Sequence, residues 1–132
     1  MNTIVNKLGL VLLPLALLCT GCDQKEAHGA GGRKLALTAP VDQSLKQGAT
    51  NDVAVKIDRN DFTGPVTIDF VGLPPGVSVA NPGPILAGDE SKDFTLRATE
   101  TAAVVNDHVV TVTASAADMR VQQTFKIDVE AR

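Results

Sequence analysis

The chain has 132 residues, 44% apolar and 20% charged, which is an ordinary composition for a folded globular protein. Its formal net charge is −3, and acidic and basic side chains are interspersed without a Lys/Arg stripe. This distribution argues against a nucleic acid partner. Aromatic residues are scarce, with four Phe and no Tyr or Trp, so Val, Ile, Leu and Ala must supply most of a core.

The first 21 residues have the order of a removable export signal. A polar start containing Lys7 is followed by an unbroken apolar run over residues 8–18, and then by small residues. A helix that spans a bilayer needs about 20 apolar residues. The run is shorter and has Pro14 in its middle, so a secretory signal is favoured over a permanent transmembrane anchor.

The signal ends in Thr20-Gly21-Cys22. This segment resembles the lipobox of bacterial lipoproteins, in which a small residue precedes a cysteine that is acylated and becomes the mature N-terminus. The resemblance implies cleavage after residue 21 and a lipid on Cys22. Cys19 stands where that motif usually has Leu. The alternative is an ordinary signal peptide cut nearby, with Cys22 incidental.

Residues 22–33 are predicted to be a flexible tether that starts at the acylated cysteine. The segment has no apolar period and contains a run of four Gly or Ala residues at positions 29–32. The 11 residues that follow Cys22, positions 23–33, would have a typical span of about 18 to 20 Å. The domain is therefore expected to stay close to the membrane.

From residue 34 to residue 132, apolar side chains recur at every second position, which is typical of half-buried strands. The alternating sets are Leu35 and Leu37; Val53, Val55 and Ile57; Val66, Ile68 and Phe70; Phe94, Leu96 and Ala98; Val110, Val112 and Ala114; and Val121, Phe125, Ile127 and Val129. Turn-forming residues lie between them, at positions 47–48, 60–61, 72–76, 81–84, 88–89, 106–107 and 117–118. Residues 99–105 form either one helical turn or a crossing between sheets.

Six or seven short strands with frequent turns predict an all-β, two-sheet sandwich. The run from Val55 to Val66 and the turn Leu73-Pro74-Pro75-Gly76 resemble bacterial immunoglobulin-like domains. The resemblance implies a single immunoglobulin-like sandwich of about seven strands over residues 34–132. The chain lacks the Trp and the paired Cys of antibody domains, so only the broader group is implied.

One loop collects oxygen-bearing side chains. Asp58, Asn60 and Asp61 offer the ligand chemistry that Ca²⁺ prefers. The alternative is a turn in which Asp and Asn bond the local backbone. Three oxygens fall below a full calcium shell, so a turn is favoured and no metal or other cofactor is expected.

No catalytic motif stands out in the sequence. His28 lies in the predicted tether, and His108 follows Asp107 at a strand entrance. Adjacent residues of a strand point to opposite faces, so Asp107 and His108 do not form a dyad. Metalloprotease, nucleophile-elbow and phosphate-loop motifs do not occur, and the protein is not expected to be an enzyme.

Two other features have paired interpretations. Leu73-Pro74-Pro75-Gly76-Val77 is either a stiff connection between strands, which is favoured, or a recognition loop. Phe62 is either an exposed anchor or, more commonly for such a residue, a plug at the end of the core.

The function expected from the sequence is a non-catalytic, lipid-anchored binding or structural module of the bacterial cell envelope. Its partners would be the membrane, through the lipid on Cys22, and an envelope protein. A carbohydrate-binding module is disfavoured because sugar stacking normally needs exposed Tyr or Trp. A calcium-dependent adhesion module and a small envelope enzyme are the remaining alternatives.

Overall fold

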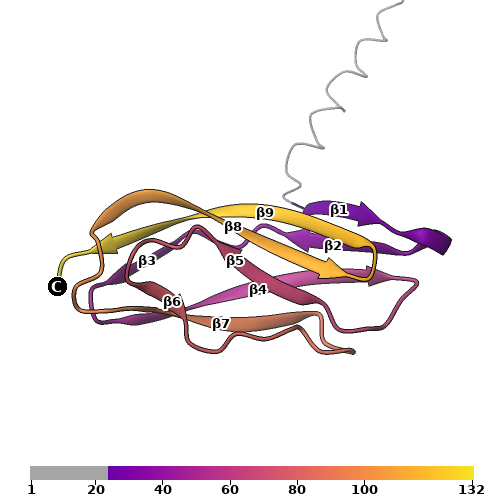
Figure 1. Ribbon diagram of the computed structural model, residues 1–132, viewed down its shortest axis with the longest axis horizontal. Helices are drawn as coiled ribbons and strands as arrows, with labels where there is room; N and C mark the ends of the chain where they lie inside the picture. The colour runs from indigo at the N-terminus through magenta and orange to yellow at the C-terminus, as the bar shows by residue number, and fades with distance from the viewer. Residues whose placement is uncertain (1–23) are drawn as a thin grey trace, which may run out of the picture.

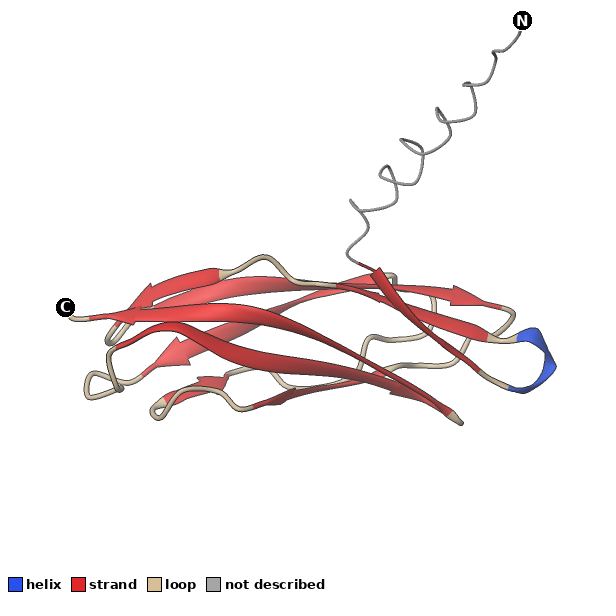
Figure 2. Cartoon of the chain, turned by 90° about the horizontal axis from the view of Figure 1, so that it is seen from above, coloured by secondary structure: helices blue, strands red, loops and turns tan. Residues whose placement is uncertain are grey.

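Nine β-strands form two packed sheets in the computed structural model, which describes residues 24–132 (Figure 1). The predicted signal and Cys22 lie outside the described residues. The strands are β1 (Gln24–His28), β2 (Lys34–Thr38), β3 (Gln43–Lys46), β4 (Thr50–Asn60), β5 (Thr67–Val71), β6 (Val77–Val79), β7 (Ser91–Ala98), β8 (Val105–Ala116) and β9 (Met119–Glu130). A 3-10 turn at Ala30–Gly32 lies between β1 and β2 (Figure 2).

Sheet A has the strand order β1-β2-β4-β7-β6, and sheet B has the order β3-β9-β8-β5. Strands β2, β4, β7 and β6 reproduce the A, B, E and D strands of an immunoglobulin sandwich, and β5, β8 and β9 reproduce C, F and G. Strand β3 pairs in parallel with β9 after the chain crosses from sheet A to sheet B. The domain is an immunoglobulin-like β-sandwich, as the sequence predicts.

The alternating apolar residues of both sheets meet in one core. Strand β9 alternates buried and exposed positions over nearly its whole length, and the predicted inward residues of β4, β7 and β8 are buried. At the centre, the ring of Phe70 packs edge-on against Phe94 at 5.2 Å and against Phe125 at 6.2 Å between centroids. Three of the four Phe thus supply the aromatic centre in a domain that has no Trp.

The predicted flexible tether is wrong for residues 24–33. Gln24–His28 forms strand β1, which pairs antiparallel with β2 from Gln24 opposite Thr38 to His28 opposite Lys34. The hairpin loop is held by Arg33, whose guanidinium donates to Asp118 Oδ1 at 2.8 Å. Backbone hydrogen bonds to the exposed edge of β2 need no apolar side chains, so the polar sequence of β1 gives no alternating signal.

A second correction concerns Asn106 and Asp107, which were predicted to form a turn. They lie inside β8, at a register shift between Val105 and His108. Asp107 has a φ of 52°, and its N–H donates to Asp128 Oδ1 at 2.6 Å. The residues that favour a turn here produce a β-bulge, because Asp107 adopts in this bulge the left-handed conformation that Asn and Asp also adopt in turns.

Residues 99–105 cross from β7 in sheet A to β8 in sheet B, which confirms the second of their two interpretations. Ala102 N–H donates to Thr99 O at 3.1 Å, and the side chain of Ala102 is buried in the core. The crossing is therefore a single tight turn that contributes to the end of the sandwich.

Candidate functional site

The loop predicted to offer oxygen ligands lies at the end of β4. Asp58 and Asn60 are exposed residues of the strand, and Asp61 follows with a φ of 61°. Among residues 24–132, no three His, Cys, Asp or Glu side chains come together in a way that would hold a metal ion.

Backbone carbonyl oxygens near the end of β4 accept hydrogen bonds from the side chain of Arg59. Its guanidinium donates from Nε to Gly64 O at 2.8 Å, from Nη1 to Asp89 O at 2.5 Å and from Nη2 to Leu86 O at 2.9 Å. These carbonyls belong to two loops, one before β5 and one after Ile85. The arginine supplies the positive charge there and ties the two loops to β4.

The two histidines lie far apart in the fold. His28 is the last residue of β1, and its Nε2 lies 3.8 Å from Glu26 Oε1 on the surface. His108 Nε2 donates to Gly72 O at 2.7 Å and so links β8 to the loop after β5. Each histidine has a local structural contact, and neither lies beside the other.

The Leu-Pro-Pro-Gly segment is a packed connection. Pro74 is buried, and Val77 N–H donates to Pro74 O at 3.0 Å. Gly76 has a φ of 87°, and a Cβ there would lie 2.7 Å from Ala102 Cα, so only glycine fits. These contacts with the β7–β8 crossing support the stiff-connection interpretation over a free recognition loop.

Phe62 is partly buried and packs against the core, as expected for a residue that closes one end of the sandwich. The large apolar side chains that remain exposed are Val41, Val71, Leu86, Val104 and Val109. Val71 and Val109 are diagonal neighbours on the outer face of sheet B, because Val71 pairs with Thr111. They form a small apolar patch beside strand β5, at the edge of its sheet.

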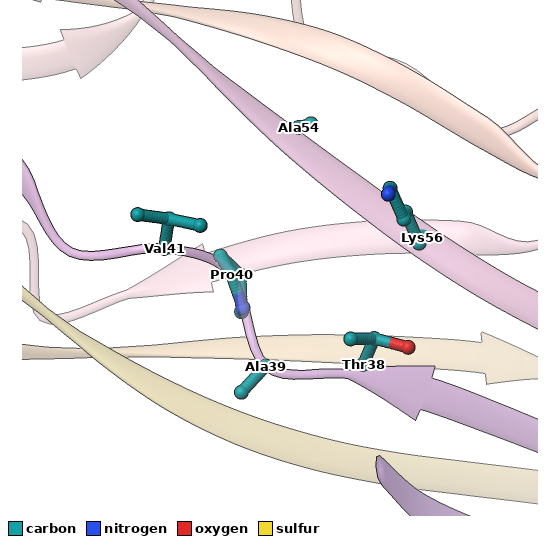
Figure 3. Close-up of a pocket in the computed structure, with 6 residues that line it drawn as sticks. All are labelled: Thr38, Ala39, Pro40, Val41, Ala54 and Lys56. Atoms are coloured by element: carbon teal, nitrogen blue, oxygen red, sulfur yellow. The ribbon is translucent and has the colours of Figure 1, made fainter. Parts of the chain in front are cut away.

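A second surface feature is a notch of about 180 Å³ where the chain leaves β2 (Figure 3). It is lined by Thr38, Ala39, Pro40, Val41, Ala54 and Lys56. The sequence did not reveal this notch, because its walls come from β2, from the crossing to β3 and from β4. No helix in the described part of the chain is long and apolar enough to cross a membrane.

No family model matches the chain, and no curated protein matches it. Solved structures with a similar arrangement include a chimeric titin Z1Z2 protein (16% identity, TM-score 0.47, 83% of this chain and 98% of that chain). Domains 4 and 5 of the S-layer protein SbsC are also similar (20% identity, TM-score 0.41, 76% of this chain and 58% of that chain). The assignment of the fold rests on the strand order described above.

Proposed function

We propose that this protein is a non-catalytic binding or structural module of the bacterial cell envelope, anchored to a membrane by lipid on Cys22. The observation that carries the proposal is the Thr20-Gly21-Cys22 sequence, which lies at the end of an apolar segment and just before the folded domain at Gln24. No other cysteine follows Cys22, so lipid attachment accounts for the one thiol left after cleavage.

Fatty-acid labelling of the Cys22→Ser variant tests the anchor. The variant is expected to lose incorporation of labelled palmitate and to leave the membrane fraction, whereas Cys19→Ser is expected to keep both. Palmitate incorporation that persists in Cys22→Ser would refute the lipoprotein assignment. The mature N-terminal mass, measured in the same samples, reports whether cleavage occurs before Cys22.

The partner is proposed to be a protein that binds at the free edge of β5. The backbone N–H and C=O of Val66 are hydrogen-bonded to Ile85. Because backbone groups alternate between the two sides of a strand, those of Ile68 and Phe70 point to the same side as those of Val66, past the end of the Val66–Ile85 bridge. An extended segment of a partner would pair with these groups, and the patch of Val71 and Val109 would pack beside it. Strand addition of this kind needs no catalytic residues.

Site-specific crosslinking in the native envelope tests this binding edge. A photoreactive residue at Val71 is expected to give a discrete adduct, and one at Arg97, on the exposed face of sheet A, is expected to give none. An adduct at Arg97 alone would move the binding surface to the other sheet.

A further inference from the structure

The notch beside Val41 arises from the switch of the chain between the two sheets. Strand β2 pairs with β4 only as far as Thr38 opposite Lys56, and the chain then crosses to β3 in sheet B. The first part of β4, from Thr50 to Val55, has no residue of β2 paired with it. The gap is bordered by the crossing, where Val41 is 77% exposed, the largest exposed fraction among the large apolar side chains of the described residues.

The strand that follows Cys22 begins next to this notch. Gln24 is paired with Thr38, which lines the notch. One residue separates Cys22 from Gln24 in the sequence, so their Cα atoms are at most about 7 Å apart. Both views of the molecule show that β1 starts part-way along the long axis and not at either tip (Figures 1 and 2).

We propose that the edge of the sandwich made by β1, β2 and the β2–β3 crossing lies directly on the lipid bilayer, with Val41 and the notch at headgroup level. The long axis of the domain then runs along the membrane. This orientation rests on the proposed lipid anchor, because the Cα of the lipid-bearing Cys22 lies within about 7 Å of that of Gln24, which leaves little chain to raise that edge off the surface.

The side chains around the notch suit an interface between water and lipid. Val41 and Ala39 supply apolar atoms, and Lys56 carries a charged end on a long apolar stem that can reach the headgroups. The carboxylate next to Val41, that of Asp42, accepts a hydrogen bond from Lys126 N at 2.9 Å and is thus engaged by β9. Asp58 and Glu90 lie in the neighbouring depression, so this surface carries no excess of positive charge that would favour anionic over zwitterionic lipid.

The same orientation turns the proposed binding edge away from the membrane. Strands β1 and β2 pack against β9, and β3 packs against β4, so the β1–β2 edge of sheet A lies over the β3 edge of sheet B. Strand β5 is at the opposite edge of sheet B, and β6 is at the opposite edge of sheet A. A domain that rests on its β1 side therefore presents β5 to the aqueous compartment.

Fluorescence quenching of the full lipidated protein in phosphatidylcholine vesicles tests the contact. In the mature chain Cys22 is the only cysteine and is blocked by lipid, so Val41→Cys provides one site for an environment-sensitive dye. Val71→Cys is the control, another exposed valine (57%) at the opposite edge. Vesicles that contain brominated lipid act as the quencher.

The dye at position 41 is expected to shift its emission to the blue and to lose most of its intensity in brominated vesicles, while the dye at position 71 keeps its intensity. Equal quenching at both positions, or none at either, in protein that carries the lipid by mass and sediments with vesicles, would overturn the orientation and leave the anchor standing. Protein that lacks the lipid by mass and fails to sediment would overturn the anchor itself, and the orientation with it.

Discussion

Gln123 of β9 donates its side-chain amide to the carbonyl oxygen of Leu37 in β2, at 3.0 Å, and so joins the two sheets through the core. The residue is only 6% exposed and occupies an inward position of β9, between Val121 and Phe125. A polar group at such a position needs a partner, because burial of an amide without a hydrogen bond is costly. The bond also fixes how β2 lies over β9.

Two replacements of Gln123 are expected to distinguish the contribution of its hydrogen bond to stability from the contribution of its packing. Gln123→Leu keeps most of the volume and should lower the free energy of unfolding by about 1 kcal/mol, the net contribution of a typical hydrogen bond. Gln123→Ala should cost more, because it also leaves a cavity. Urea denaturation measures both, and a Leu variant as stable as the parent would show that the bond contributes no more than the apolar burial that Leu adds.

Arg59 is expected to stabilise the loops before β5 and after Ile85. Arg59→Ala removes the hydrogen bonds to Gly64, Leu86 and Asp89 and should lower the free energy of unfolding by about 2 to 3 kcal/mol. Arg97→Ala, at an exposed position of β7, should change it by less than about 0.5 kcal/mol. Equal changes in the free energy of unfolding for the two variants, measured by urea denaturation, would show that the hydrogen bonds of Arg59 do not stabilise these loops.

Phe94 tests the assignment of the core. It is 1% exposed and contacts the ring of Phe70, so Phe94→Ala should lower the free energy of unfolding by about 3 to 5 kcal/mol. Chemical denaturation provides the measurement. A loss below about 1 kcal/mol would mean that the register of β7 against β4 is wrong.

Thr113 offers the reverse case, a substitution that should stabilise the domain. Its side chain is 2% exposed, and its Oγ1 has no hydrogen-bond partner among the residues that the structure describes. Thr113→Val replaces the hydroxyl with a methyl group of similar size and should raise the free energy of unfolding by about 1 kcal/mol. Thr111→Val, at a less buried position of the same strand face, is the control, and a destabilised Thr113 variant would contradict the reasoning.

Removal of divalent cations should leave the stability unchanged. Among residues 24–132 no three acidic, His or Cys side chains come together to hold a metal ion, and the loop carbonyls of Gly64 and Leu86 already accept hydrogen bonds from Arg59. Thermal unfolding with and without a chelator is the measurement. A marked drop in Tm on chelation, abolished in an Asp61→Ala variant, would restore the calcium interpretation.

The sequence predicts those parts of the fold in which side chains alternate between core and solvent. Strands β4, β7 and β9 have this pattern over most of their length and β8 has an alternating apolar set over residues 110–114, so their inward residues could be named in advance. Strand β1 has only Ala27 packed against the core, and β3 has only Leu45 buried. Such strands are held by backbone hydrogen bonds, which depend little on the type of side chain.

The surface features were harder to predict for a related reason. Val41 gives no periodic signal, and its neighbours in the notch, such as Ala54 and Lys56, come from a different strand. Gln123 is a polar residue at an apolar position, and its partner Leu37 is 86 residues away in the chain. In both cases the relevant contact exists only once the two sheets are stacked.

Strand β1 has a mechanical consequence for a protein held at its N-terminus. A pull on the anchor away from the domain loads the Gln24–Thr38 pair first, and the later pairs would open one after another toward His28. Peeling exposes little apolar surface, since only Ala27 of this strand packs against the core. Residues 24–33 would then add about 35 Å of extended chain between the anchor and the domain. This extra length would let the rest of the sandwich follow a moving partner without unfolding.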